Sequence, residues 1–151
     1  MLFRSLVANF HVVRWIWRPG VRRVVIRAEG RSFHASVATV WPSADIAVLR
    51  VKATLKALET NTDRPELGQP VVVLGSPYGF GGTASTGIVS GIRRRWVQFS
   101  APVSPGSSGG PVLDAEGRVI GVAAAKVLGR GVEGLSFAIP IGRVCRLTAA
   151  C

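Results

Sequence analysis

The chain has 151 residues, 48% of them hydrophobic, which is enough for one globular domain with a sizeable core. Its 19 basic and 8 acidic residues give a formal net charge of +11, which would favour nucleic acid or an anionic membrane as partners, but no nucleic-acid motif accompanies the charge. The chain has no long apolar run, and its only cysteines, Cys145 and Cys151, lie at the C-terminus, so a membrane span, a disulfide framework and a zinc cluster are not indicated.

From the N-terminus, residues 1–27 are basic, apolar and free of acidic residues, as in a targeting peptide, but we expect them to belong to the fold because they contain His11. Nine short segments from Val21 onward have the composition of β-strands and are separated by Gly, Pro, Asn and Asp turns. This pattern predicts an all-β barrel or sandwich rather than a parallel α/β sheet. The expected strands are Val21–Arg27, Ser32–Trp41, Ile46–Val51, Pro70–Leu74, Ala84–Gly91, Trp96–Ala101, Val112–Leu113, Arg118–Ala125 and Leu135–Ile139.

The stretch Pro105–Pro111 holds two serines among three glycines. Because glycine adopts positive φ and lets the backbone approach a ligand closely, successive N–H groups of this turn can point at one oxygen beside the Ser108 hydroxyl. That geometry suits acyl transfer, although a plain surface turn has a similar composition. A nucleophilic serine also requires a base and a carboxylate that orients the base.

Few residues can fill these two roles. Of the two histidines, His34 lies on an alternating strand whose apolar face is formed by Phe33, Ala35 and Val37, so it is expected to face solvent and to be structural. His11 stands at the edge of an apolar run and is the candidate base. Asp45 precedes the apolar strand Ile46–Val51, where a buried carboxylate needs a hydrogen-bond partner such as a histidine, although a turn-forming Asp is the simpler alternative. The other two aspartates have ordinary settings, Asp63 in a solvated loop and Asp114 in a hairpin turn.

The order His11, Asp45, Ser108 is that of chymotrypsin-like proteases, and the surrounding segments resemble the HtrA (Deg) branch of that superfamily. The resemblance continues in order to about Ile141. The matching segments are His11-Val12-Val13, Asp45-Ile46-Ala47-Val48-Leu49, Leu74-Gly75-Ser76-Pro77-Tyr78-Gly79, Thr86-Gly87-Ile88-Val89-Ser90, Pro105–Pro111, Gly117–Val122 and Gly134–Pro140.

This resemblance implies a chymotrypsin-type fold of two six-stranded antiparallel barrels in a single protease domain. The first barrel, about residues 1–58, is expected to be incomplete because only ten residues precede His11, and the second is expected at about residues 66–151. The polar segment Asn61–Pro65 fits a boundary between residues 54 and 68. The implied catalytic residues are His11, Asp45 and Ser108, with the N–H groups of Gly106 and Ser108 as the oxyanion hole.

The family also implies where substrate binds and what accompanies the enzyme. Pro102, Val103, Leu135 and Ser136 are expected to bind substrate in an apolar pocket for small aliphatic side chains, because no acidic residue stands at the base of the pocket. The expected partners are unfolded or damaged polypeptides, with no cofactor and no metal. Members commonly form trimers, carry a PDZ domain and work outside the cytoplasm or in organelles; no PDZ segment is recognised here, and the elements used for trimerisation are missing before His11.

Two other interpretations stay open at this point. An inactive pseudoprotease that binds peptides would have the same motifs. A basic nucleic-acid-binding β domain would use Arg22-Arg23, Arg27, Arg31 and Arg93-Arg94-Arg95, with Trp96 as a stacking residue. The simpler explanation of these arginines is that they coat exposed strand faces, and no specific nucleic acid is expected.

Overall fold

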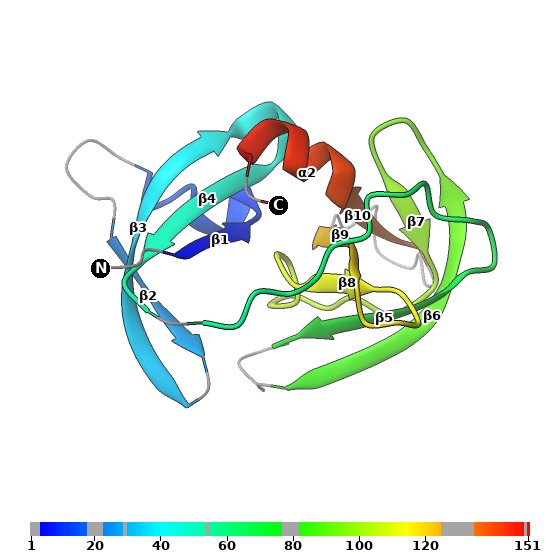
Figure 1. Cartoon of the computed structure of the whole chain (residues 1–151), viewed down its shortest axis with the longest axis horizontal. Coiled ribbons are helices and arrows are strands. Elements are labelled where there is room, and N and C mark those ends of the chain that lie inside the picture. The colour runs from blue at the N-terminus through cyan, green and yellow to red at the C-terminus, as the bar shows by residue number, and fades with distance from the viewer. Residues whose placement is uncertain are drawn as a thin grey trace. The chain divides into compact units, whose positions relative to one another are not determined.

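The computed structural model describes residues 4–17, 23–28, 30–53, 55–76, 82–124, 135–149 and 151. Among these residues the fold is nearly all β, which confirms the predicted fold class (Figure 1). The chain divides into two compact units, Met1–Ala57 and Leu58–Cys151, which are described one at a time. Parts of four predicted segments, residues 21–22, 77–79, 125 and 134, lie outside the described residues.

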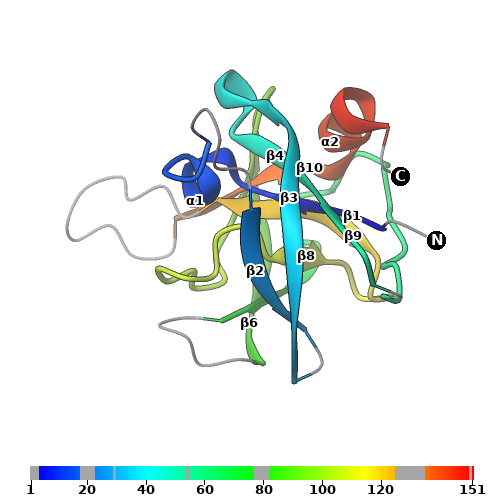
Figure 2. The ribbon, with the colours of Figure 1, turned by 90° about the vertical axis from the view of Figure 1, so that its left-hand side faces the viewer.

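The first unit contains a four-stranded antiparallel sheet in the order β1-β4-β3-β2. The strands are β1 (Arg4–Ala8), β2 (Arg23–Ala28), β3 (Arg31–Trp41) and β4 (Ile46–Val51), with a short helix α1 (Phe10–Val13) after β1 and a 3-10 turn η1 (Pro42–Ala44) before β4. In Figure 2, β2 lies along β3, with which it forms an antiparallel hairpin. Four strands are fewer than the six of a complete barrel.

Strand β4 is the centre of this unit because it is hydrogen-bonded on both sides. It pairs with β1 from Ala8↔Ala47 to Arg4↔Val51, and with β3 across a bulge between Val37 and Thr39. Its burial pattern is almost continuous, as expected for an interior strand. The unit's core consists of Val13, Ala35, Val37, Ala47, Leu49 and Val51.

Strand β1 at Arg4–Ala8 was not predicted, because no strand was expected before Val21, and that expectation is wrong. Leu6 and Ala8 of this strand pack at the edge of the core, and the strand is hydrogen-bonded to β4. Its composition alone is a weak indication of a β-strand. The exposed position of His34 on β3 is as predicted.

The second unit is a closed barrel of six antiparallel strands in the order β10-β7-β6-β5-β8-β9, which confirms the predicted six-stranded barrel. Its strands are β5 (Pro70–Gly75), β6 (Thr83–Ile92), β7 (Val97–Phe99), β8 (Pro111–Leu113), β9 (Val119–Ala124) and β10 (Ser136–Pro140). The interior is filled mainly by valines and alanines around Phe99, which is fully buried. A closed barrel leaves no unpaired sheet edge.

The helix α2 (Ile141–Thr148) follows β10 directly and was not predicted. It buries Ile141 and Val144. The two cysteines, for which no disulfide was expected, are bonded to each other, with their Cα atoms 5.3 Å apart. The helix ends at Thr148, and the left-handed backbone of the next residue, Ala149, turns the chain back so that Cys151 meets Cys145.

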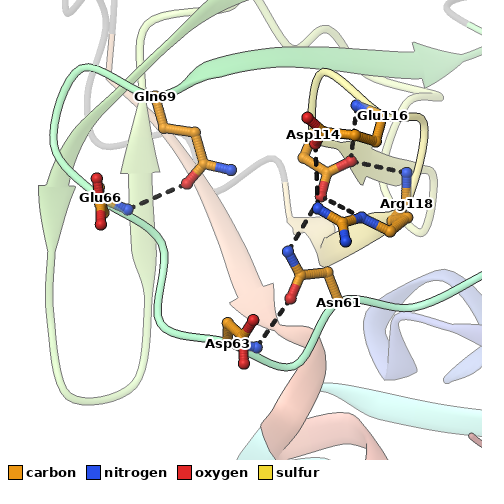
Figure 3. A network of polar contacts seen from close by, with 7 residues as sticks. All are labelled: Asn61, Asp63, Glu66, Gln69, Asp114, Glu116 and Arg118. Carbon is orange, nitrogen blue, oxygen red and sulfur yellow. Dashed lines mark hydrogen bonds and ion pairs between the residues drawn. The ribbon is translucent and has the colours of Figure 1, made fainter.

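A buried carboxylate holds the hairpin between β8 and β9, so Asp114 is not the ordinary turn residue that the sequence suggested (Figure 3). It accepts hydrogen bonds from the N–H groups of Glu116 and Arg118, from Arg118 Nε at 3.0 Å and from Asn61 Nδ2 at 3.1 Å. Burial alone would raise the pKa of Asp114, but the hydrogen bonds from Asn61 and Arg118 and the Arg118 charge hold that pKa below its ordinary value of 3.8. Asp114 therefore anchors Asn61 and the segment after it to the barrel.

Candidate active site

A histidine and an aspartate predicted as base and orienting residue lie together in the first unit. His11 Nδ1 is 2.8 Å from Asp45 Oδ2, and the His11 backbone N–H donates to Asp45 Oδ1 at 2.9 Å. The His11 side chain is 38% exposed and the Asp45 side chain 18%, so the carboxylate is sheltered while part of the imidazole remains accessible. One carboxylate thus binds both the ring and the backbone of the same histidine, which fixes the ring's position.

The pairing of β1 with β4 explains why these two residues meet. Because the strands are antiparallel, the C-terminal end of β1 lies beside the N-terminal start of β4, with Ala8 opposite Ala47. His11 follows β1 in the helix α1, and Asp45 immediately precedes β4. The N–H of Phe10 donates to the Asp45 carbonyl oxygen at 3.1 Å, which extends the contact between the two segments.

Asn9 supports Asp45 from the other side and was not singled out in the sequence. It is fully buried, and its Nδ2 donates to the Asp45 carbonyl oxygen at 3.2 Å. Its Oδ1 is buried and has no hydrogen-bond partner within the described part of the chain. A buried amide at this position ties Asp45 to the chain two residues before His11. The signal that could have revealed it is a polar residue between the apolar strand and α1.

Asp45 itself has an uncommon backbone conformation, with φ 56° and ψ 40°. This left-handed region is costly for most residues and is better tolerated by Asp and Asn. The preceding turn η1 requires it, since the Asp45 N–H donates back to the Pro42 carbonyl oxygen at 3.1 Å. The backbone of Asp45 therefore completes the turn η1, while its carboxylate binds His11.

In the second unit, the glycine-rich turn that carries Ser108 has a defined hydrogen-bond pattern. The N–H of Ser107 donates to Ser104, that of Gly110 to Ser107, and that of Gly109 to the carbonyl oxygen of Ala123 in β9. These three N–H groups are engaged and are not oxyanion donors. Gly106 and Gly109 have φ values of +98° and +88°, the conformations for which the sequence suggested glycine.

Two further glycines let this turn pack against the end of β5. A Cβ on Gly110 would collide with the carbonyl oxygen of Leu74, and a Cβ on Gly75 would lie 2.7 Å from the Cβ of Ser107. Ser107 is buried, whereas Ser108 beside it is half-buried. The close approach positions Ser107 and thereby the backbone that leads into Ser108.

The predicted substrate-binding residues also lie in the second unit. Ser136 Oγ donates to the carbonyl oxygen of Ala101 at 2.7 Å, which joins the start of β10 to the segment before the Ser108 turn. Pro102 and Leu135 are exposed, and Val103 packs partly against the barrel core. Apolar groups are thus present among the predicted residues, and residues 125–134, between β9 and Leu135, lie outside the described residues.

Groups that could bind a metal ion are scarce. Among the described residues, no cluster of three or more His, Cys, Asp or Glu side chains is placed to hold a metal. In the same part of the chain, no helix has the length and apolar character needed to cross a membrane.

Comparison with known proteins shows which family the chain resembles. Residues 4–122 match the model of a family described as a trypsin-like peptidase domain. The chain is 33% identical over 147 residues to a probable periplasmic serine endoprotease, DegP-like, of Chlamydia trachomatis, and 35% identical over 155 residues to the mitochondrial serine protease HTRA2 of Drosophila grimshawi. It is 33% identical over 156 residues to the chloroplastic protease Do-like 1 of Arabidopsis thaliana. These matches cover 89 to 92% of this chain but only 29 to 35% of the relatives.

Proposed function

Because the chain belongs to the trypsin-like peptidase domain family and resembles its HtrA-like members, we propose that it is a serine endopeptidase with His11, Asp45 and Ser108 as catalytic residues. The observation that carries this proposal is the double contact of the Asp45 carboxylate with His11, through the ring at 2.8 Å and the backbone at 2.9 Å. A carboxylate on Nδ1 favours the tautomer that carries its proton there and leaves Nε2 free to accept one.

The reaction follows from these roles. His11 Nε2 takes the proton of the Ser108 hydroxyl as its oxygen attacks a peptide carbonyl, and Asp45 stabilises the imidazolium that forms. The N–H groups of Gly106 and Ser108 stabilise the oxyanion of the tetrahedral intermediate. His11 then gives its proton to the leaving amine, which produces an acyl-enzyme on Ser108, and water activated by His11 hydrolyses it.

The substrate class is proposed from the apolar residues near the serine turn. Pro102, Val103 and Leu135 would line a pocket for small aliphatic side chains, and Ser136 would fix the adjoining backbone through its bond to Ala101. Unfolded or damaged polypeptides expose such side chains and are the expected substrates. By similarity to relatives named as periplasmic, mitochondrial and chloroplastic, the expected location is outside the cytoplasm or in an organelle. A homo-oligomer is expected only from the family resemblance of the sequence.

The test compares wild type with Ser108→Ala on an unfolded, dye-labelled protein and with a fluorophosphonate probe. We expect cleavage and labelling of the wild type and loss of both in Ser108→Ala. The control is Ser5→Ala, which removes an exposed hydroxyl on β1 and should leave both unchanged. If a folded wild-type sample is not labelled, the endopeptidase proposal fails and a peptide-binding pseudoprotease takes its place.

A further inference from the structure

The second unit contains a pocket of about 440 Å³ whose lining is strongly basic. It lies among α2, the turn between β6 and β7, and the segment 62–65. Only one acidic residue, Asp63, lines it, against five positive charges, which gives a net charge of +4. The basic residues are Arg64, Arg93, Arg94, Arg143 and Arg146.

These arginines come from three separate segments of the chain. The ion pairs found within the described residues join His11 to Asp45 and Arg118 to Asp114 and Glu116, so none of the five is neutralised by a carboxylate there. Like charges gathered around one pocket repel each other unless an anion lies between them. Arginines spread singly over a surface would not create this cost. The arrangement therefore points to an anionic ligand.

Hydrogen bonds within the chain hold the backbone on two sides of the pocket. The N–H of Asp63 donates to Asn61 Oδ1 at 3.0 Å, and Asn61 is itself held by the buried Asp114 (Figure 3). The β6–β7 turn is closed by a bond from the Arg93 N–H to the Trp96 carbonyl oxygen at 2.8 Å. A site organised in advance loses less conformational entropy when it binds.

The first turn of α2 packs closely against the segment 62–65. A Cβ placed on Gly142 would lie 3.5 Å from the carbonyl oxygen of Thr62 and 3.7 Å from Arg146 Nη1. The helix begins after Pro140 with no side-chain cap and no acidic residue in its first turn. Its N–H groups and dipole add to the positive potential that the arginines create.

Apolar side chains also contribute to the lining, namely Ile92, Val97, Ile120 and Ile141. Apolar groups in the lining lower the local polarity, which strengthens the attraction of the arginines for an anion. The pocket shares no residue with the Ser108 turn or with the predicted substrate-binding residues. It is a separate site.

We propose that this pocket binds a compact ligand with several adjacent phosphates, such as a triphosphate group. Planar guanidinium groups bind phosphate oxygens through paired hydrogen bonds, and five arginines line this pocket. The volume exceeds that of a single phosphate and lies in the range of small-molecule sites. The phosphates of a nucleic acid are spaced along its backbone, whereas the positive charges here surround a single pocket. The triphosphate comes from a free polyphosphate chain or from a nucleotide.

The test measures binding by isothermal titration calorimetry at low ionic strength, with sodium tripolyphosphate in one arm and ATP in the other. We expect saturable binding in at least one arm, and a loss of affinity of about tenfold or more in Arg143→Ala/Arg146→Ala. Binding in the tripolyphosphate arm alone assigns the site to free polyphosphate. Tighter binding in the ATP arm assigns it to a nucleotide.

The matched control is Arg50→Ala/Arg95→Ala. Both double variants lower the formal net charge from +11 to +9, but Arg50 and Arg95 do not line the pocket, and Arg95 lies in the same turn as Arg93 and Arg94. Equal weakening in the two double variants would mean that only net charge matters and would overturn the proposal. Absence of saturable binding in both arms, or binding of an oligonucleotide alone, would also overturn it. The measurement does not use proteolysis, so its failure is distinct from failure of the endopeptidase proposal.

Discussion

Replacing Asp45 with Asn tests whether the carboxylate orients His11 as proposed. Asn tolerates the left-handed conformation that Asp45 has at φ 56°, so the turn before β4 should survive the change. The side chain would, however, have one acceptor oxygen where the carboxylate has two. That oxygen would stay with the His11 N–H, and the amide NH₂ would face the ring at Nδ1. The imidazole would then have to carry its proton on Nε2 and could not accept one from Ser108.

The size of the effect follows from which interactions are lost. Folding loses one charge-assisted hydrogen bond in a partly exposed pair, which should lower the free energy of unfolding by only about 1 kcal/mol. The proposed catalysis loses its base, and the same substitution in a Ser-His-Asp triad costs on the order of 10⁴ in kcat, or about 5 kcal/mol of transition-state stabilisation. We therefore expect the variant to have nearly the stability of wild type and a strongly reduced kcat.

The assay measures kcat/KM on the labelled unfolded substrate and the melting temperature of the same preparation. Glu59→Gln is the matched control, since it makes the same carboxylate-to-amide change at an exposed position, and neither quantity should change by much. If Asp45→Asn kept activity within about tenfold of wild type while folded, Asp45 would not orient the catalytic base. A folded wild type that is inactive would instead refute the endopeptidase proposal itself.

Three further outcomes follow from the structure. Asp114→Asn should lower the free energy of unfolding by about 2 to 3 kcal/mol, because its amide would face the donors of Asn61 and Arg118. The pKa of Asp114 is depressed in the folded state, so the carboxylate stabilises the fold above its ordinary pKa of 3.8. In urea titrations the difference in stability between wild type and variant should therefore be full above pH 4 and shrink as the pH falls below 3.8. Gly75→Ala should lower the free energy of unfolding by about 1 to 3 kcal/mol and reduce fluorophosphonate labelling, because the new Cβ must displace Ser107. An unchanged melting temperature and labelling rate would contradict this packing. Cys151→Ser should destabilise by at most about 2 kcal/mol, since the disulfide closes a loop with a sequence separation of only 6, and a reducing agent should then affect wild type but not the variant.

Much of the fold could be predicted because its strands carry their own signal. The strand expected at Ala84–Gly91 is found at Thr83–Ile92, and the one expected at Ile46–Val51 has those bounds. The helix α2 could not be found in this way, since it contains a glycine and several residues with weak helix propensity, and is stabilised by burying Ile141 and Val144. The disulfide depends on that helix, because the left-handed Ala149 turns Cys151 back toward Cys145.

The site was predictable to the extent that its residue types are rare. Only two histidines were available, and the structure pairs His11 with Asp45. The contact between the Asp45 carboxylate and the His11 backbone, and the support from Asn9, depend on how two loops meet and leave no pattern in the sequence. The basic pocket was predictable only in part, because Arg93 and Arg94 were candidate contacts for nucleic acid, whereas Arg64, Arg143 and Arg146 join them from distant segments.

The contact between His11 and Asp45 requires only some of the strands in the first unit. His11 lies three residues beyond the end of β1 and Asp45 one residue before β4, and these two strands are paired along all five residues of β1. The position of one residue relative to the other is therefore set by a single strand pair, together with η1 and the buried Asn9. Strand β2 lies two positions away from β4 in the sheet, beyond β3, and takes no part in it. For this reason the His11–Asp45 geometry is a local property of the β1–β4 pair, and a complete barrel is not needed to maintain it.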